Sequence, residues 1–235
     1  FQTVKGGGHG DYRLITLAPS SVQEMADFVG LGFELAFKYS NPAIILADGV
    51  IGQMMEKVVL PEQRTRLTDE EVIARCPWAT TGRTHHRTPN IITSLELDPA
   101  EMEKRNIHLQ KKYAEIEENE VRFEELHCED AEYLIVAFGS CARIAQKAME
   151  MAREEGIKVG LLRPITLWPF PSKAIAARAA QVKGILTVEL NAGQMVEDVR
   201  LAVECKVPVE HFGRLGGIVP DPDEVITALK EKLIK

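Results

Sequence analysis

Apolar runs alternate with amphipathic segments through the last hundred or so residues of the chain. Residues 133–138 form an unbroken apolar run, which is typical of a strand buried on both faces. Ser140 follows as a candidate helix N-cap, residues 141–152 carry apolar side chains at helical spacing, and Gly156 stands where a helix would end. Residues 159–162 form a second apolar run. This order predicts a right-handed crossover in a parallel sheet.

The same alternation continues to the end of the chain. It predicts a helix from Ser172 to about Val182, strands at residues 185–189 and 209–212, and helices at residues 194–204 and from Asp221 onward. Together these segments predict a doubly wound α/β domain with a parallel sheet over residues 130–235.

Residues 1–60 contain a shorter version of the pattern. They predict strands at residues 14–18 and 43–47 with a helix at residues 22–39 between them. This helix is apolar over most of its circumference, which is typical of a helix buried between layers or between subunits. Two strands do not make a stable parallel sheet. We therefore expect that the sequence, which begins at Phe1, is a fragment whose first unit is completed by residues outside it or by a partner.

Two side chains stand at the carboxyl ends of predicted strands, where open parallel sheets bind ligands. Asp48 is either a ligand contact or a turn or cap residue. Arg163 is a candidate substrate-binding residue, because a guanidinium pairs well with a carboxylate or phosphate, and the alternative is a structural ion pair.

Residues 61–129 differ in character, and we interpret them as a linker excursion followed by a long connecting helix. Residues 91–97 predict one strand of a hairpin. Asp98 and Pro99 predict a helix start, with an apolar stripe that continues to about Leu126. Cys76 with the adjacent His85 and His86 does not predict a metal site, because neighbouring side chains in a strand point to opposite faces.

Composition limits the classes of partner. The net charge of -7 over 235 residues and the lack of a basic run with aromatics argue against nucleic-acid binding. No apolar run has the length of a membrane span. The four cysteines form no Cys-x-x-Cys pair, so we expect no iron–sulfur cluster in this chain. Cys141 and Cys205 fall in or beside predicted core elements, and we interpret the cysteines as buried free thiols of a cytoplasmic protein.

The combined order of several motifs carries a resemblance. These are Gly-Gly-His-Gly-Asp from residue 7, Ala-Pro-Ser-Ser-Val from residue 18, and Asn-Pro-Ala-Ile-Ile-Leu-Ala-Asp from residue 41. Leu-Leu-Arg-Pro-Ile-Thr-Leu-Trp-Pro-Phe-Pro from residue 161 and Glu-Leu-Asn-Ala-Gly-Gln from residue 189 follow. The pattern resembles the α subunit of 2-oxoacid:ferredoxin oxidoreductases of the 2-oxoisovalerate or 2-oxoglutarate type, and it covers nearly the whole chain. The resemblance implies the second half of a pyrimidine-binding domain followed by a domain like the C-terminal domain of transketolase.

The resemblance also implies a reaction and its parts. These enzymes decarboxylate a 2-oxoacid on thiamine diphosphate, reduce ferredoxin through iron–sulfur clusters, and yield an acyl-coenzyme A. The diphosphate and its Mg²⁺ would be held by a β subunit, and the clusters by partner subunits, including γ and ferredoxin-like δ subunits. The ring-activating glutamate and the substrate loop of the family precede Phe1, so we expect the fragment alone to be inactive and assign no catalytic residue.

According to the resemblance, the glycine segment at the start of the chain is the part of the family's site that this sequence contains. It implies that Gly8, His9, Gly10 and Asp11 lie close to the cofactor and a subunit interface. His9 titrates near neutral pH and is a candidate donor to substrate or cofactor, or else a structural histidine that anchors the glycine turn.

Three alternatives remain open. One is a related thiamine enzyme, such as a transketolase or a β-type dehydrogenase subunit. The second is a non-catalytic assembly module, and the third is a nucleotide-binding or acyl-coenzyme A-binding domain, although no phosphate fingerprint is present. A homodimer would cover the apolar surface of residues 11–58.

Overall fold

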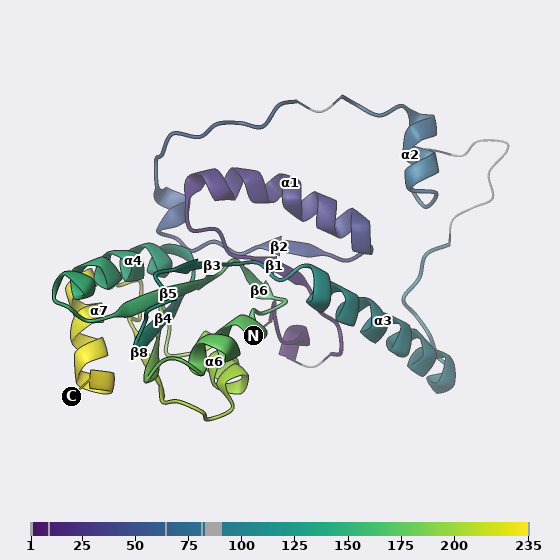
Figure 1. Ribbon diagram of the computed structural model, residues 1–235. Helices are drawn as coiled ribbons and strands as arrows, with labels where there is room; N and C mark the ends of the chain where they lie inside the picture. Colours follow the sequence, from purple (N-terminus) through teal and green to yellow (C-terminus); the bar gives the residue numbers. More distant parts are fainter. Residues whose placement is uncertain (1, 9, 64, 81, 83–90, 235) are drawn as a thin grey trace.

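The computed structural model describes all residues except 1, 9, 64, 81, 83–90 and 235, and it contains two sheets (Figure 1). The larger sheet has five strands in the order β3-β5-β4-β7-β8. Their bounds are β3 (Phe123–Leu126), β4 (Tyr133–Ala137), β5 (Val159–Pro164), β7 (Gly184–Glu189) and β8 (Val209–Gly213). All pairs are parallel except β3 with β5. The predicted doubly wound parallel sheet is therefore confirmed, with one antiparallel edge strand added.

Helices cover both faces of this sheet. Their bounds are α4 (Gly139–Glu154), α5 (Ser172–Ala179), α6 (Met195–Val203) and α7 (Pro222–Leu229), and a terminal turn, η3 (Lys230–Ile234), follows. Ile135 of β4 packs into the core with α4 and α7, whereas Leu134 and Val136 pack with α5 and α6. This division follows from the strand repeat, in which successive side chains point to opposite faces. Each fully buried aliphatic side chain stabilises the fold by roughly 1.5–3 kcal/mol.

The smaller sheet has three strands in the order β2-β1-β6. Strand β1 (Ile15–Leu17) pairs in parallel with β2 (Ala43–Ile45) and antiparallel with β6 (Thr166–Trp168). Strand β6 was not predicted, and it comes from the segment directly after β5. Residues from the predicted C-terminal domain thus complete the sheet of the N-terminal unit, so the two units share a strand.

Helix α1 (Val22–Tyr39) has the predicted bounds, and the Ser21 hydroxyl accepts a hydrogen bond from the backbone N–H of Glu24 as its N-cap. Its inner face buries Phe28, Leu35 and Tyr39. The opposite face is largely exposed: Val29, Phe33 and Phe37 are 48%, 64% and 54% exposed, and the ring of Phe37 stacks on that of Trp78 with the ring centroids 5.9 Å apart. The expected burial between layers therefore holds for one face only, and burial between subunits stays a prediction.

Helix α3 (Pro99–Asn119) begins as predicted, with the Asp98 carboxylate accepting from the N–H groups of Ala100 and Glu101. The prediction that it continues to Leu126 is wrong. Residues 123–126 form β3, which pairs with β5. The apolar stripe ran past the true end of the helix because it included residues of the edge strand β3, of which Leu126 packs against the core and Phe123 is 39% exposed.

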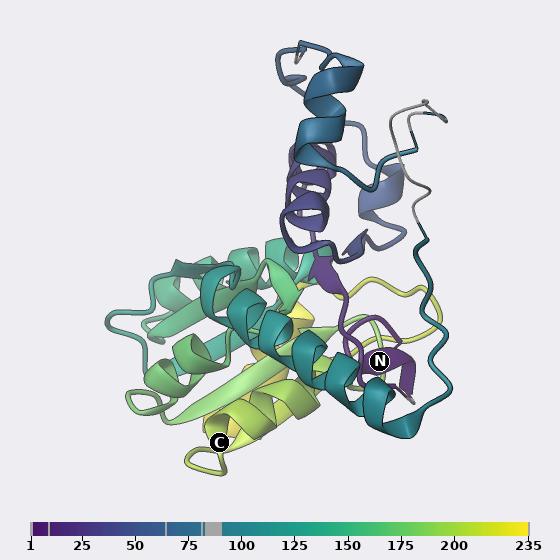
Figure 2. The same cartoon turned by 90° about the vertical axis from the view of Figure 1, so that its right-hand side faces the viewer.

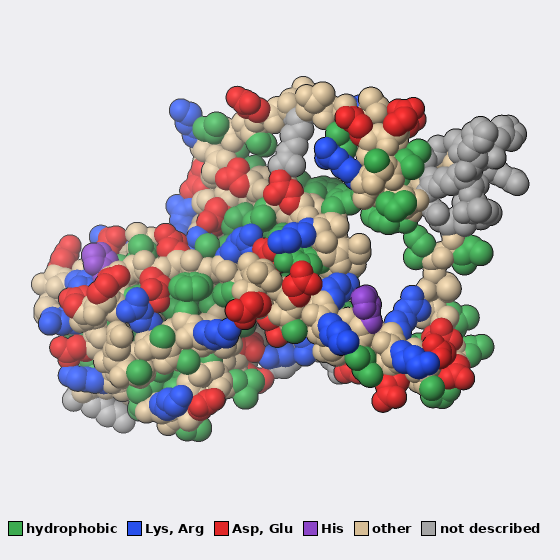
Figure 3. All heavy atoms as spheres, turned by 45° about the vertical axis from the view of Figure 1, so that its right-hand side comes forward, with side chains coloured by type: hydrophobic (Ala, Val, Ile, Leu, Met, Phe, Trp, Pro, Cys, Tyr) green, Lys and Arg blue, Asp and Glu red, His purple; other side chains and the backbone are tan. Residues whose placement is uncertain are grey.

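The described residues between 54 and 98 form an excursion that stands away from the two sheets (Figure 2). It follows the short turn η2 (Ile51–Gln53) and contains α2 (Asp69–Arg75), whose first turn is fixed by a capping box between Thr68 and Glu71. The strand predicted at residues 91–97 is absent, since this described segment has no ladder partner. Apolar side chains gather around the opening between the excursion and the body (Figure 3). Among the described residues, no helix has the length and apolar character needed to cross a bilayer.

Candidate functional site

The carboxyl ends of β4 and β7 are neighbours in the large sheet, and the chain leaves them toward opposite faces, into α4 and α6. Ligands of doubly wound sheets bind at such a point. A pocket of about 160 Å³ opens here, lined by Asp48, Phe138, Cys141, Val188, Glu189, Leu190 and Asn191. A second pocket shares three of these residues and is bounded by Thr3, Val4 and Lys5 from the start of the chain. The two pockets form one crevice between the N-terminal unit and the large sheet.

Asp48 enters this crevice from the end of β2. Its Oδ2 accepts a hydrogen bond from the backbone N–H of Ser140 at 2.8 Å, and its Oδ1 accepts from the N–H groups of Val50 and Ile51, each at 3.0 Å. The carboxylate thus caps two helical turns that belong to different units. Of the two alternatives for Asp48, the structure shows the cap.

Gly139 makes this contact sterically feasible. Its φ is +61°, and a Cβ atom there would lie 2.7 Å from Oδ2 of Asp48. Ser140 is not the N-cap that was predicted: Phe138 takes that position without a side-chain cap, and Ser140 lies in the first turn of α4. The carboxylate of Asp48 replaces the missing cap because it satisfies a helix N-H and complements the helix dipole.

Glu189 performs the same role for α6. This fully buried carboxylate accepts from the backbone N–H groups of Gln194, Met195 and Val196 at 2.9–3.1 Å. The imidazole Nδ1 of His211 lies 3.5 Å from Oε1 of the same carboxylate. Both helix N-termini that face the crevice are therefore occupied by side chains of the chain itself.

The crevice contains no reactive thiol. Burial, together with the negative charges of Asp48 and Glu189, raises the pKa of the Cys141 thiol to about 12. Burial likewise raises the pKa of Cys128 to about 11. A thiolate is the nucleophilic form of cysteine, so both residues act as buried apolar groups at neutral pH. The prediction of a buried thiol is confirmed for Cys141 and is wrong for Cys205, which is exposed.

The predicted cofactor segment folds as a tight turn, η1 (Gly6–Gly8). Gly7 has a φ of +65°, and a Cβ atom there would lie 2.1 Å from the hydroxyl oxygen of Tyr12. The N–H of Gly10 donates to the carbonyl of Gly6, and the side-chain amide of Gln110 in α3 donates to the carbonyl of Asp11. His9 lies outside the described residues. Gly8, Gly10 and Asp11 are thus brought together in one compact turn, whose Asp11 is exposed.

Arg163 faces carboxylates of the same chain. Its guanidinium forms a bidentate pair with Glu24 at 2.7 and 2.8 Å and also donates to Glu124 and to the hydroxyl of Ser20. Burial opposes ionisation of Glu24, but the bonds from Arg163 and Ser20 outweigh it and hold the pKa of that carboxyl below its usual range. The structural ion pair that was the alternative for Arg163 is present, and it joins the start of α1 to β5. A substrate contact stays a prediction.

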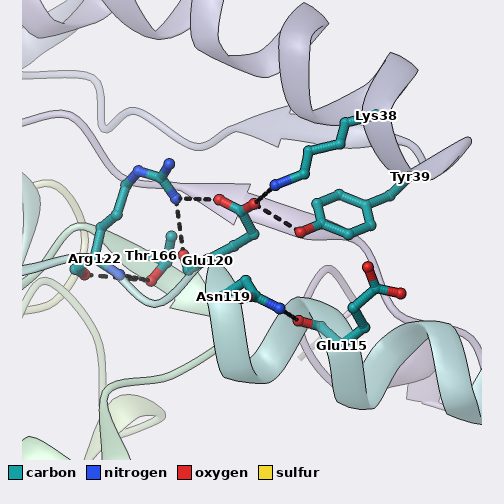
Figure 4. Close-up of polar contacts among 7 residues, drawn as sticks. All are labelled: Lys38, Tyr39, Glu115, Asn119, Glu120, Arg122 and Thr166. Carbon is teal, nitrogen blue, oxygen red and sulfur yellow. Dashed lines mark hydrogen bonds and ion pairs between the residues drawn. The ribbon is translucent and has the colours of Figure 1, made fainter.

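Glu120 is a buried carboxylate that sequence reasoning missed (Figure 4). It lies at the end of α3 and is 3% exposed, and it accepts from the ammonium of Lys38, the phenol of Tyr39 and the guanidinium of Arg122. These contacts join α1 to α3 and to the start of β3. No local pattern identifies this cluster, because its members become neighbours only when the helices pack.

The described residues contain no group of three or more His, Cys, Asp and Glu side chains that could hold a metal ion. His85 and His86 lie outside the described residues. The exposed carboxylate of Asp11 and the backbone of the glycine turn offer acceptors and donors to a polar ring. Two cations lie beside the turn: Lys5 is paired with Asp198, and the guanidinium of Arg13 donates to the backbone carbonyl of Tyr12.

Comparison with known proteins gives the family. Residues 4–126 match the thiamine diphosphate-binding domain of pyruvate flavodoxin/ferredoxin oxidoreductases, and residues 131–225 match core domain II of pyruvate:ferredoxin oxidoreductase. The ketoisovalerate oxidoreductase subunit VorB of Methanothermobacter marburgensis is 47% identical over 98% of this chain and 63% of its own length. The 2-oxoglutarate synthase subunit KorA of Archaeoglobus fulgidus is 33% identical over 92% of this chain and 60% of its own length. The chain thus spans about three-fifths of the length of these relatives.

Solved structures agree with the fold. The 2-oxoglutarate:ferredoxin oxidoreductase from Magnetococcus marinus superposes with a TM-score of 0.77 at 25% identity, over 98% of this chain and 44% of that chain. A split-gene transketolase has a TM-score of 0.52 at 14% identity and shows a likeness of fold alone. These matches confirm the predicted resemblance to the 2-oxoacid:ferredoxin oxidoreductases and the predicted transketolase-like fold. The chain belongs to the pyruvate flavodoxin/ferredoxin oxidoreductase family.

Proposed function

We propose that this chain is part of the α-type subunit of a thiamine diphosphate-dependent 2-oxoacid:ferredoxin oxidoreductase, and that the substrate is a branched 2-oxoacid such as 2-oxoisovalerate. The observation that carries the proposal is the 47% identity to VorB, which extends over both units and the glycine turn. The identity to KorA is lower, at 33%, and this favours the branched substrate.

In this proposal the glycine turn contacts the cofactor. Gly8, His9, Gly10 and Asp11 would lie against the aminopyrimidine ring, and the β subunit would hold the diphosphate and Mg²⁺. Thiamine diphosphate, when bound, supplies the carbanion chemistry of decarboxylation. The chain's own residues position the ring and exclude water from it. Iron–sulfur clusters would lie in γ and δ subunits, with coenzyme A and ferredoxin as co-substrates.

The closed helix N-termini support this proposal over the nucleotide-binding alternative. A phosphate group binds well at a helix N-terminus whose N–H groups are unpaired. At the crevice, Asp48 occupies the N-terminus of α4 and Glu189 occupies that of α6. A nucleotide phosphate would have to displace a carboxylate from either position.

The surface of α1 is consistent with a multi-subunit enzyme. Its exposed Phe33 and Phe37 form an apolar stripe of the kind that subunit contacts cover. We assign this stripe to contacts within the complex, a second copy of the chain included. We propose a cytoplasmic location for such a complex, because the iron–sulfur clusters of its partner subunits would be sensitive to oxygen.

The test is reconstitution of the full-length subunit with its partner subunits. The complex should contain thiamine diphosphate, show the broad visible absorption of iron–sulfur clusters, and reduce ferredoxin when given 2-oxoisovalerate and coenzyme A. Activity with 2-oxoglutarate or pyruvate in place of 2-oxoisovalerate would overturn the substrate assignment only. A colourless complex without thiamine would overturn the proposed function.

A further inference from the structure

The glycine turn is tied to core domain II by one ion pair. The ammonium of Lys5, the residue directly before η1, pairs with the carboxylate of Asp198 in the first turn of α6. The side chains are 30% and 20% exposed, so the pair is largely shielded from solvent. Figure 1 shows the turn beside α6 and below α3.

Further contacts to the turn come from the N-terminal part of the chain. Tyr12 packs against Gly7 and Gly10, and Gln110 of α3 donates to the carbonyl of Asp11. These contacts shape the turn itself. The pair of Lys5 with Asp198 links the turn to α6, which packs on the large sheet.

Asp198 is itself held in place. It follows Met195 and Val196, whose backbone N–H groups are fixed by the buried carboxylate of Glu189 at the end of β7. A rigid path therefore runs from the strand through the first turn of α6 to Lys5. A glycine-rich backbone has high conformational freedom. An ion pair that restrains such a segment before binding lowers the entropy cost of ordering it when a ligand binds.

We propose that Lys5 and Asp198 are positioning residues for the cofactor turn: their ion pair holds the described residues of the turn, Gly6–Gly8, Gly10 and Asp11, in the place where thiamine diphosphate binds. This inference rests on the proposed function for the role of the cofactor. The ordering of the turn by Lys5 stands without it.

The experiment uses the full-length subunit in its assembled complex with Lys5→Met, Asp198→Asn and the exchanged pair Lys5→Asp with Asp198→Lys. Lys183→Met is the matched control, because Lys183 forms an ion pair with Glu132 in the same domain, far along the chain from the turn. The readouts are amide hydrogen exchange of residues 2–12 and the dissociation constant of thiamine diphosphate, titrated into the apo complex.

Both single variants should speed amide exchange in residues 2–12 and raise the dissociation constant of thiamine diphosphate by about fivefold. A change of this size corresponds to the entropy cost of ordering roughly one residue of backbone. The exchanged pair should restore both values, and Lys183→Met should change neither. Unchanged exchange and affinity in the single variants, or failure of the exchanged pair to restore them, would overturn the inference. A wild-type complex that binds no thiamine diphosphate would instead overturn the proposed function, while the exchange data would still decide whether Lys5 orders the turn.

Discussion

The Oδ2 atom of Asp48 lies 2.8 Å from the backbone nitrogen of Ser140 and accepts its hydrogen bond. Asp48 follows β2 of the thiamine-binding unit, and Ser140 lies in the first turn of α4, the first helix of core domain II. One carboxylate therefore sets the geometry between two parts of the chain that fold around separate sheets.

Replacement of Asp48 with Ala should lower the free energy of unfolding by about 2 kcal/mol, because three backbone N–H groups lose their acceptor at the two helix starts. Asp48→Asn should cost less, since it keeps one acceptor oxygen. Urea unfolding followed by circular dichroism measures both. Ser140→Ala is the matched control: its buried Oγ has no hydrogen-bond partner in the structure, so its removal should cost little. Equal stability of Asp48→Ala and wild type would contradict the cap.

Glu189→Gln should destabilise the chain by about 2 kcal/mol, because an amide cannot accept all three N–H groups with the charge that the α6 dipole favours. The control is Glu197→Gln, an exposed acid in the first turn of the same helix. Thermal unfolding should separate the two variants. If both lower the melting temperature equally, the effect is a general one of charge and the specific capping role of Glu189 is wrong.

The cluster around Glu120 should make stability depend on acid pH. Burial raises the pKa of this carboxyl, but the hydrogen bonds from Lys38, Tyr39 and Arg122 outweigh burial, and the net pKa is lowered from 4.5. A lowered folded-state pKa means that the stabilisation is present above about pH 4.5 and is lost as the pH falls below it.

Between pH 7 and pH 3, the free energy of unfolding should therefore decrease more steeply with falling pH in wild type than in Glu120→Gln. At pH 7 the variant should be less stable by about 2 kcal/mol. Glu118→Gln removes a neighbouring exposed ion pair with Lys173 and should leave the wild-type slope unchanged. Parallel pH profiles for wild type and Glu120→Gln would rule out this cluster as the source of the acid loss.

Gly7→Ala should destabilise the glycine turn. The φ of +65° costs an alanine about 1–2 kcal/mol, and the added Cβ would also push against the Tyr12 hydroxyl. The free energy of local opening, measured by hydrogen exchange at residues 2–12, should fall more than the free energy of global unfolding. Gly30→Ala in α1 is the control, because a Cβ atom there meets nothing within 4 Å. A turn that exchanges as slowly in Gly7→Ala as in wild type would show that the positive φ is not required.

The sequence by itself determined the regular elements and the family. Strands such as β4 and β7 are short apolar runs buried on both faces, and the bounds of α1 follow from its Ser21 cap and apolar spacing. These signals are local, so they are legible one segment at a time. The motif order carried the family resemblance, which the comparisons confirm.

Tertiary structure decided the contacts that join distant segments. Strand β6 pairs with β1 although some 150 positions separate them, and α3 stops before β3 because an edge of the large sheet accepts residues 123–126. Asp48 and Arg163 were visible as candidates, but only packing showed that their partners are Ser140 and Glu24. A side chain's role at a strand end depends on which polar group reaches it, and that is fixed by the arrangement of elements in space.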